Sequence, residues 1–249
     1  MNAQIEIQKL EKMFPKKERK RASVLKISEL GICAGEFFCI LGPSGCGKTT
    51  LLNIVAGFEK PTAGTVLVNQ KQVKSPDSKY VTVFQEPALF PWKTVKENVL
   101  FGLEIKGTKN VLAEKIANQC IARVGLRGFE GFRAHQLSGG MKQRVSIARA
   151  LAVDPGILFM DEPFGALDAL TRLQLQEELR KVWQETKKTI VFITHDIEEA
   201  LRLADRIAVM RSNPGRIERT FRIAQNRPRN LDSKELLDLK KKIYTTLKL

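Results

Sequence analysis

The chain contains 249 residues, of which 43% are hydrophobic and 28% are charged. These proportions are ordinary for a globular protein, and the length suffices for one large domain or two small ones. No stretch approaches the ~18 to 20 consecutive apolar residues that are needed to cross a bilayer, and the N-terminal residues lack the apolar segment of a secretory signal. We therefore expect the protein to remain in the cytoplasm.

The cysteine content favours a reduced compartment. A disulfide framework is not expected in a chain of this length, because its four cysteines form no CxxC pair. With two histidines and no Cys/His cluster, a dedicated zinc site has little support. The cysteines are Cys33, Cys39, Cys46 and Cys120.

The formal net charge of +15 is concentrated at the two ends of the chain. Residues 1–21 carry +4 and residues 211–249 carry +7, which leaves +4 for the long central part. No aromatic-rich RNA-binding motif accompanies this charge, so nucleic-acid recognition is disfavoured. Attraction to anionic lipid headgroups, attraction to an acidic partner and a simply solvated surface remain open.

The first half of the chain shows strands, a short apolar helix and then a helical stretch. Continuous apolar or β-branched runs predict strands at 36–41, 64–68 and 80–84. The helix that follows the first strand is expected to stop at Gly57. The capping box Thr94–Glu97 opens a second helix, and a third has helical spacing that ends near Gly125.

The second half alternates strands with helices. Apolar strands are predicted at 156–160 and 189–194. A long amphipathic helix begins after Asp168 and carries Leu175, Leu179 and Val182 on one stripe. A short helix is capped by Asp196. A turn is expected at residues 213–215, and the segment after residue 230 could form one more amphipathic helix. This alternation indicates an α/β fold with a parallel sheet that helices cover on both faces.

Residues 42–49 match the pattern of a phosphate loop, and they lie between a predicted strand and a predicted helix. Glycines let backbone N–H groups converge on phosphate oxygens, and the helix N-terminus adds a positive dipole end. Lys48 is expected to reach the β and γ phosphates, and the hydroxyl of Thr49 to ligate Mg²⁺. The alternative is a structural glycine-rich turn. The predicted nucleotide-binding residues are Gly42, Pro43, Ser44, Gly45, Cys46, Gly47, Lys48, Thr49 and Thr50.

A carboxylate pair follows the predicted strand 156–160. Asp161 would lie at the carboxyl end of the strand, where ligands of parallel sheets bind, and is the candidate partner of Mg²⁺. Glu162 is free to orient or polarise an attacking water molecule. The alternative is a solvated Asp-Glu pair that caps the next turn.

Two more polar side chains follow predicted buried strands. Gln85 comes directly after the strand at 80–84 and could contact Mg²⁺ or the water molecule. His195 comes directly after the strand at 189–194 and could hold the γ phosphate. Either residue could equally be an ordinary surface residue at a strand end.

A second glycine-rich helix start lies at Leu137–Gly140, where Ser138 is the expected N-cap. With this segment, the motifs resemble those of ATP-binding cassette (ABC) ATPases. The phosphate loop, Gln85, Leu-Ser-Gly-Gly, Asp161-Glu162, Ala-Leu-Asp at 166–168 and the strand-end histidine occur in the order found in that family. The resemblance covers about residues 5–225.

The resemblance implies a fold and a division of the chain. It implies a P-loop NTPase core with a mostly parallel sheet, an N-terminal antiparallel β part and an inserted helical subdomain. The implied single nucleotide-binding domain comprises the core at 1–86 and 151–225, the helical subdomain at 87–150 and a basic C-terminal tail at 226–249.

The resemblance also implies a shared ATP site. In this family two ATPase domains pair head to tail, so Ser138, Gly139 and Gly140 would face the γ phosphate bound to the partner's phosphate loop. Phe14 matches the position that stacks on adenine, with an ordinary apolar anchor as the alternative. Asp168 matches the acid that communicates between the two sites, and it could also serve only as a helix cap.

Two positions depart from the family pattern. Met141 stands where the family often has Gln, and Gln143 follows two residues later. A basic run, KKERKR, directly follows Phe14. We expect the contact to the partner's ATP to survive through Ser138 and its neighbouring glycines.

The segments VFQEPALFPW, NVLFGL and VMRSNPGRI most closely resemble the ATPases of nitrate, sulfonate and taurine importers. In such importers a short coupling helix of the membrane permease docks beside the segment after Gln85. Phe90 and Trp92 are expected to line that groove, or else to be buried in the domain's own core. The resemblance implies ATP and Mg²⁺ as cofactors, and as partners a second copy of the chain, permease subunits and a substrate-binding protein. It places the chain at the cytoplasmic face of the membrane.

Two other functions of ABC ATPases remain as alternatives. One is the ATPase of a lipid or drug exporter, which the absence of a fused membrane segment in this sequence disfavours. The other is a soluble cassette ATPase that acts on nucleic acid or ribosomes, which usually has two cassettes or long coiled-coil insertions. The sequence shows one cassette and no sustained heptads.

Overall fold

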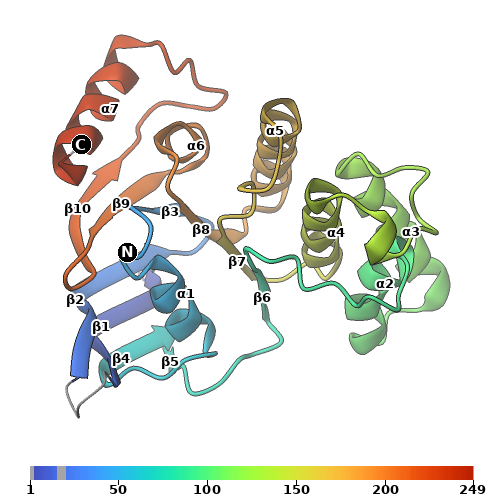
Figure 1. The fold of residues 1–249 in the computed structure, drawn as a ribbon, viewed down its shortest axis with the longest axis horizontal. Helices are drawn as coiled ribbons and strands as arrows, with labels where there is room; N and C mark the ends of the chain where they lie inside the picture. The colour runs from blue at the N-terminus through green and yellow to red at the C-terminus, as the bar shows by residue number, and fades with distance from the viewer. Residues whose placement is uncertain (1–2, 16–20, 249) are drawn as a thin grey trace. The chain divides into compact units, whose positions relative to one another are not determined.

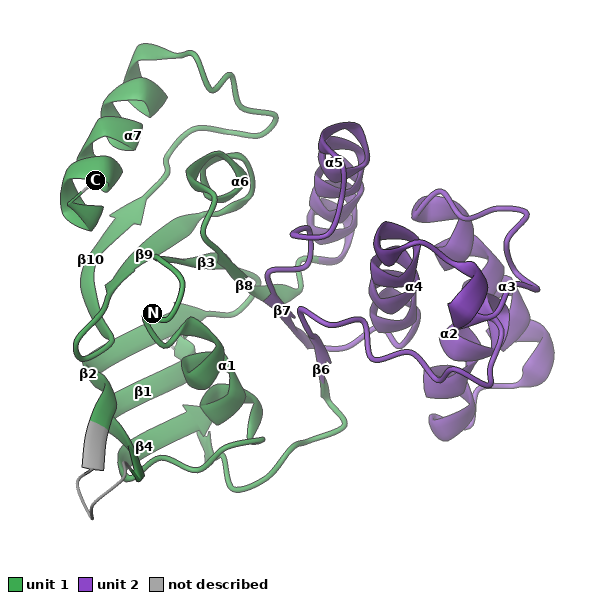
Figure 2. Ribbon diagram, in the orientation of Figure 1, with its two compact units in different colours: residues 1–80, 187–249 green, residues 81–186 purple. Residues whose placement is uncertain are grey.

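The computed structural model describes residues 3–15 and 21–248, and the basic run KKERKR after Phe14 lies largely outside them. The chain divides into two compact units, which are distinguished by colour in Figure 2. The first unit contains Met1–Tyr80 and Lys187–Leu249, and the second contains Val81–Thr186.

The first unit contains an antiparallel sheet in the order β2-β1-β4-β5. Its strands are β1 (Ala3–Pro15), β2 (Arg21–Cys33), β4 (Ala63–Val68) and β5 (Lys71–Gln72). Strand β1 pairs with both β2 and β4, and its side chains Ile5, Ile7 and Leu10 are buried. The N-terminal antiparallel β part implied by the family resemblance is therefore present.

The same unit contains strands in the order β10-β9-β3-β8. These are β3 (Phe37–Leu41), β8 (Thr189–Thr194), β9 (Arg206–Arg211) and β10 (Arg216–Arg222). Strand β3 is parallel to both β8 and β9, while β9 and β10 form an antiparallel hairpin. Every residue of β3 and β8 is buried, which explains why both strands read as continuous apolar runs.

The described residues of the first unit also form the helices α1 (Lys48–Ala56), α6 (Ile197–Leu203) and α7 (Lys234–Leu247). Helix α1 contacts β4, α6 contacts β3 and β8, and α7 contacts β9 (Figure 1). Gly57 ends α1 in the left-handed conformation, as expected from the sequence. Asp196 caps α6 by accepting hydrogen bonds from the N–H groups of Glu198 and Glu199.

The second unit contains the neighbouring strands β6 and β7 and most of the helical residues. Its elements are β6 (Tyr80–Val83), α2 (Val95–Ile105), α3 (Asn110–Arg123), the 3₁₀ turn Ala134–Gln136, α4 (Gly139–Ala152), β7 (Ile157–Asp161) and α5 (Ala169–Thr186). Helices α2, α3 and α4 contact one another, and each has a fully buried apolar residue, namely Val99, Ala117 and Val145. The capping box of Thr94 and Glu97 is confirmed. No helix among the described residues meets the length and hydropathy of a membrane span.

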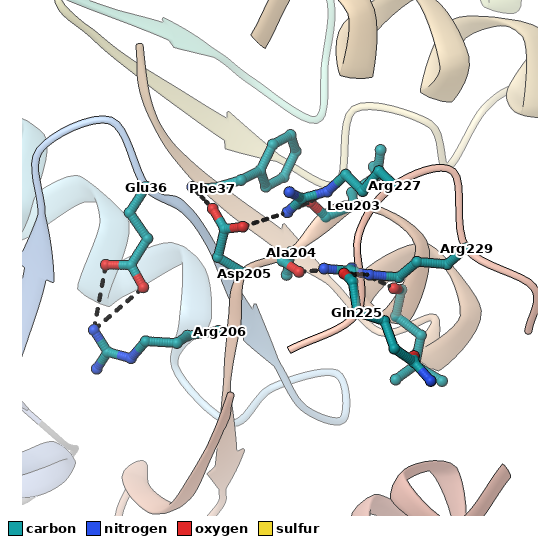
Figure 3. A network of polar contacts seen from close by, with 10 residues as sticks. Glu36, Phe37, Leu203, Ala204, Asp205, Arg206, Gln225, Arg227 and Arg229 are labelled. Atoms are coloured by element: carbon teal, nitrogen blue, oxygen red, sulfur yellow. Dashed lines mark hydrogen bonds and ion pairs between the residues drawn. The ribbon is translucent and has the colours of Figure 1, made fainter. Parts of the chain in front are cut away.

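An ion-paired network fixes the start of β9 in the first unit (Figure 3). Asp205 accepts a hydrogen bond from the N–H of Phe37 at 2.9 Å, and its other carboxylate oxygen lies 2.8 Å from the Arg227 guanidinium. Next to it, the Arg206 guanidinium lies 3.2 Å from Glu36, whose pKa is raised by burial. The network thereby ties β3 to β9 and to the segment that leads to α7.

Arg229 holds the polypeptide between β10 and α7 against α6. Its guanidinium donates to the carbonyls of Leu201 and Ala204 at 2.7 Å and to that of Gln225 at 3.0 Å, as Figure 3 shows in part. Only 8% of the residue is exposed, and burial lowers its pKa to about 10. A buried guanidinium that donates to several carbonyls supplies the hydrogen bonds that these carbonyls would otherwise lack where a loop covers the end of a helix.

We expect Arg229→Ala to lower the free energy of unfolding by about 2 kcal/mol, because buried carbonyls would lose their donor. Urea unfolding monitored by circular dichroism measures the change. Arg222→Ala, which alters an exposed arginine on β10, is the matched control and should stay within about 0.5 kcal/mol of the parent. Equal losses in the two variants would contradict a special anchoring role for Arg229.

Candidate functional site

The first unit brings two of the predicted site segments to one edge of its parallel strands. Strands β3 and β8 are in register, with Leu41 opposite Thr194. Gly42 and His195 therefore leave the sheet side by side, at the carboxyl ends of neighbouring parallel strands. His195 is exposed there, so its imidazole is accessible to a ligand.

The loop between β3 and α1 has an open backbone that turns into the helix. Gly45 and Gly47 have φ values of 77° and 98°, which favour glycine. Pro43, Ser44 and Gly45 are exposed, whereas Cys46 is buried. The N–H groups at the start of α1 are thus presented at an accessible rim, the arrangement that binds anions at helix N-termini.

Lys48 curls back over this loop. Its Nζ donates hydrogen bonds to the carbonyl of Gly42 at 2.8 Å and to that of Pro43 at 3.1 Å, and only 5% of the residue is exposed. The ammonium is thereby held over the loop itself. Thr49, in the first turn of α1, is exposed, and Thr50 is half-buried.

Phe14 lies near the end of β1, opposite Ala22 of β2. Its side chain is 37% exposed, and the Nζ of Lys12 lies 4.7 Å from its ring centroid. The ammonium of Lys12 is held in turn by the carboxylate of Glu59 at 2.6 Å. The ring therefore presents an accessible aromatic face on the antiparallel sheet.

In the second unit, Asp161 and Glu162 differ sharply in environment. Asp161 is the last residue of β7 and is 3% exposed. Glu162 is half-buried, and its φ of 43° lies in the left-handed region that a glutamate rarely adopts. Such a backbone costs about 1 to 3 kcal/mol, and strain of this kind clusters at active sites. The strained turn directs the side chain of Glu162 differently from a continued strand.

Gln85 is exposed and follows β6. The residue before it is anchored, because the side-chain amide of Gln143 on α4 donates to the carbonyl of Phe84 at 3.2 Å. Gln143 is 1% exposed. In the sequence, Gln143 is recognisable only as a departure from the family pattern, and nothing there predicts this anchoring contact.

The N-terminus of α4 is open. Ser138 is the N-cap, and its Oγ accepts a hydrogen bond from the N–H of Met141 at 3.2 Å, which confirms the expected cap. Ser138 and Gly139 are exposed, and apart from the adjacent residues and the backbone of α4 itself, no atom lies within 4 Å of the position that a Cβ on Gly139 would take. The positive end of a fourteen-residue helix is therefore accessible to an anion.

Asp168 caps α5. Its Oδ1 accepts a hydrogen bond from the N–H of Thr171 at 3.0 Å, and this contact lowers the pKa of the carboxyl below its ordinary value. The carboxylate is exposed. The predicted helix cap is confirmed, and the cap leaves the carboxylate accessible to further contacts.

An aromatic cluster follows Gln85 in the second unit. The ring of Phe90 lies 4.5 Å from that of Phe101 and 5.6 Å from that of Trp92. Phe90 is half-buried, but Trp92 is 68% exposed and so does not belong to the core of the unit. A large aromatic side chain with this exposure is typical of an interaction surface.

Asn98, which the sequence analysis missed, holds this cluster in place. The side chain is 1% exposed. It accepts a hydrogen bond from the N–H of Phe90 at 2.9 Å and donates to the carbonyls of Phe90, Lys93 and Thr94. Only the folded turn shows this role, since an asparagine on a helix has many possible partners in sequence.

The predicted residues are divided between the two units. Phe14, residues 42–50 and His195 belong to the first unit, and Gln85, Ser138, Gly139, Gly140, Asp161, Glu162 and Asp168 belong to the second.

Comparison with known proteins identifies the class. Residues 25–165 match the ABC transporter family. An uncharacterised ABC transporter ATP-binding protein of Methanocaldococcus jannaschii is 48% identical over all of this chain and 92% of that protein. The taurine import ATP-binding protein TauB of Roseobacter denitrificans is 48% identical over 88% of this chain and 82% of that protein. A dimeric bacterial ABC transporter cassette superposes with a TM-score of 0.80 and 34% identity, covering 89% of this chain and 100% of the cassette.

The chain belongs to the ABC transporter family. It has the α/β fold of the family's ATP-binding cassettes and is an ATPase that serves transport. A cassette of the same fold has also been solved in a post-hydrolysis state with ADP and phosphate. The predicted family, fold class and enzyme class are thereby confirmed.

Proposed function

We propose that this chain is the ATP-hydrolysing subunit of an importer for a small anion such as taurine, a sulfonate or nitrate. The observation that supports an ATP site is the register of β3 and β8, because Gly42 and His195 follow directly from neighbouring parallel strands. The similarity to the TauB proteins, 48% and 47% identity for two of them, supports the importer type. A permease and a separate binding protein would handle the transported anion.

The phosphate loop would bind the triphosphate of ATP through backbone N–H groups at the start of α1. Lys48, now bonded to Gly42 and Pro43 of its own loop, would turn its ammonium to the β and γ phosphates. Phe14 would stack its exposed ring on adenine. The residues of the loop, 42–50, would together form the cradle.

Mg²⁺ fits the side chains that the proposal assigns to it. The hydroxyl of Thr49, the amide oxygen of Gln85 and the carboxylate of Asp161 are hard oxygen donors. Mg²⁺ commonly takes one or two protein ligands together with substrate phosphates and water. When bound, it would neutralise charge on the phosphates during hydrolysis.

Glu162 would orient and polarise the attacking water molecule, with its strained backbone setting the direction of the carboxylate. Gln85 would contact the same water molecule, and the imidazole of His195 would hydrogen-bond the γ phosphate. Attack of water on the γ phosphorus breaks its bond to the bridging oxygen and yields ADP and phosphate.

A second copy of the chain would complete the site. One subunit leaves the γ phosphate open to water on one side, whereas a second helix N-terminus would exclude that water. The open N-terminus of α4, with Ser138, Gly139 and Gly140, suits this role because it is exposed and positive. Asp168 would communicate between the two sites of a head-to-tail dimer.

The aromatic cluster of Phe90, Trp92 and Phe101 would receive a coupling helix of the permease. The guanidinium of Arg149 supports it by donating to the carbonyl of Ala88 at 3.0 Å and lying 5.8 Å from the Phe90 ring. The subunit would then work as a peripheral protein on the cytoplasmic face of the membrane. Movement of this segment with Gln85 would transmit the state of the ATP site.

We expect Glu162→Gln to lower the steady-state rate of ATP hydrolysis at least ~10²-fold, because the water molecule loses its base. ATP binding, measured with a fluorescent analogue, should be retained. Glu104→Gln, which changes an exposed carboxylate on α2, is the matched control and should hydrolyse ATP at the parent rate. Turnover near the parent rate in Glu162→Gln would remove Glu162 from the catalytic role.

We expect Ser138→Arg to prevent ATP-dependent dimerisation, because a bulky cation would occupy the surface that meets the partner's ATP. Light scattering of this variant in the Glu162→Gln background measures the dimer. Ser138→Ala, which removes the cap but adds no bulk, should lose about 1 kcal/mol of stability and still dimerise. A normal dimer formed by Ser138→Arg would contradict the shared site.

We expect Trp92→Ala to weaken capture of the permease from native membranes, because the exposed indole supplies most of the accessible aromatic surface of the cluster. Affinity purification followed by mass spectrometry measures the captured permease. Val111→Ala, at an apolar residue of α3 that is 88% exposed, is the matched control. Capture of ribosomes or nucleic acid in place of a multi-spanning protein would refute the importer assignment.

A further inference from the structure

The turn between β9 and β10 reaches the strand that lies under the phosphate loop. The N–H of Gly215 donates to the carbonyl of Val24, and the N–H of Lys26 donates to the carbonyl of Gly215, both at 2.8 Å. These two bonds make a one-residue parallel bridge between Leu25 of β2 and Gly215. The turn is thereby fixed to β2.

Gly215 also lies directly against the backbone of the phosphate loop. A Cβ on Gly215 would lie 2.2 Å from the carbonyl oxygen of Cys46 and 2.8 Å from that of Val24. Both distances are far below van der Waals contact, and backbone atoms have little freedom to retreat. Gly215 does not have a positive φ, so space and not backbone conformation requires glycine at this position.

The side chain of Leu25 is a second point of contact between the β9–β10 turn and the phosphate loop. A Cβ on Gly47 would lie 2.6 Å from Leu25 Cδ2, and one on Gly215 would lie 2.9 Å from the same atom. Leu25 is completely buried. The phosphate loop therefore rests on a floor made by Leu25 and Gly215, with no room for a side chain on either glycine.

This contact fixes the direction of one peptide group in the phosphate loop. The Cys46 carbonyl oxygen faces Gly215, because it is the atom nearest to the position of a Cβ there. In a planar trans peptide the N–H points away from the C=O. The N–H of Gly47 must therefore point away from Gly215, and in the proposed site a phosphate would accept its hydrogen bond.

We propose that Gly215 is a positioning residue for ATP, which sets the orientation of the Cys46–Gly47 peptide in the phosphate loop. The inference rests on the proposed phosphate site. The β9–β10 turn is far from this loop in sequence, and no motif of the sequence analysis assigned it a role in nucleotide binding. Occupancy of the loop by ATP would in turn order the turn and the bridge to β2.

Gly215→Ala is expected to raise the KM for ATP about tenfold, because small misplacements of binding groups cost that much or more. The kcat at saturating ATP should change less than twofold. A merely destabilised fold would lower the active fraction, and so the apparent kcat, without raising KM. Gly31→Ala on β2 is the matched control, because its Cβ would lie at an ordinary 3.4 Å from that of Ala3. An unchanged KM in folded Gly215→Ala would overturn the proposal.

Hydrogen exchange on protein with the native turn tests the proposal even if Gly215→Ala fails to fold. Mg·ATP added to Glu162→Gln protein should slow exchange at the amides of Gly215 and Lys26, and the slowing should be absent in Lys48→Ala. Unchanged exchange at both amides in protein that binds ATP would overturn the role of Gly215. Full ATP binding by Lys48→Ala would instead refute the proposed phosphate site.

Discussion

The parallel pairing of β3 with β8 on one side and β9 on the other is the constraint on which the first unit depends. All five residues of β3 are buried, so this strand cannot shift its register without exposing apolar side chains or breaking two ladders. Its carboxyl end fixes where the phosphate loop begins. The same register delivers His195 from β8 beside that loop, and β9 continues into the turn that supports it.

Charged side chains hold the start of β3 and the end of α6 in place. Asp205 accepts from the N–H of Phe37, and Arg227 binds the same carboxylate, so the start of β3 is held by charge-assisted contacts. Arg229 satisfies carbonyls at the end of α6. Two of the basic residues near the C-terminus, Arg227 and Arg229, therefore have structural roles that the net charge alone does not reveal.

Two residues of the second unit are distinguished by a strained backbone and by an exposed helix N-terminus. Glu162 is held in the left-handed backbone region, and Ser138 stands at an uncovered helix N-terminus. Both features cost folding energy or leave polar groups open, which a purely structural segment would avoid. Such features suit the proposed site, which ATP and a second subunit would complete.

Many of the helices and strands of this protein could be predicted from local sequence patterns. Continuous apolar runs predicted β3, β7 and β8, helical periodicity predicted α3 and α5, and the capping box of Thr94 and Glu97 predicted the start of α2. The pattern proposed as a phosphate loop does lie between a strand and a helix. Strand β1 was not predicted from its pattern, because register shifts in its pairing interrupt the alternation of buried and exposed residues. The roles of Asn98, Arg229 and Gly215 depended on tertiary structure alone. Their partners are backbone carbonyls and turns that only folding brings close. Because every residue has a backbone carbonyl, the sequence does not show which of them will accept a hydrogen bond from a given side chain.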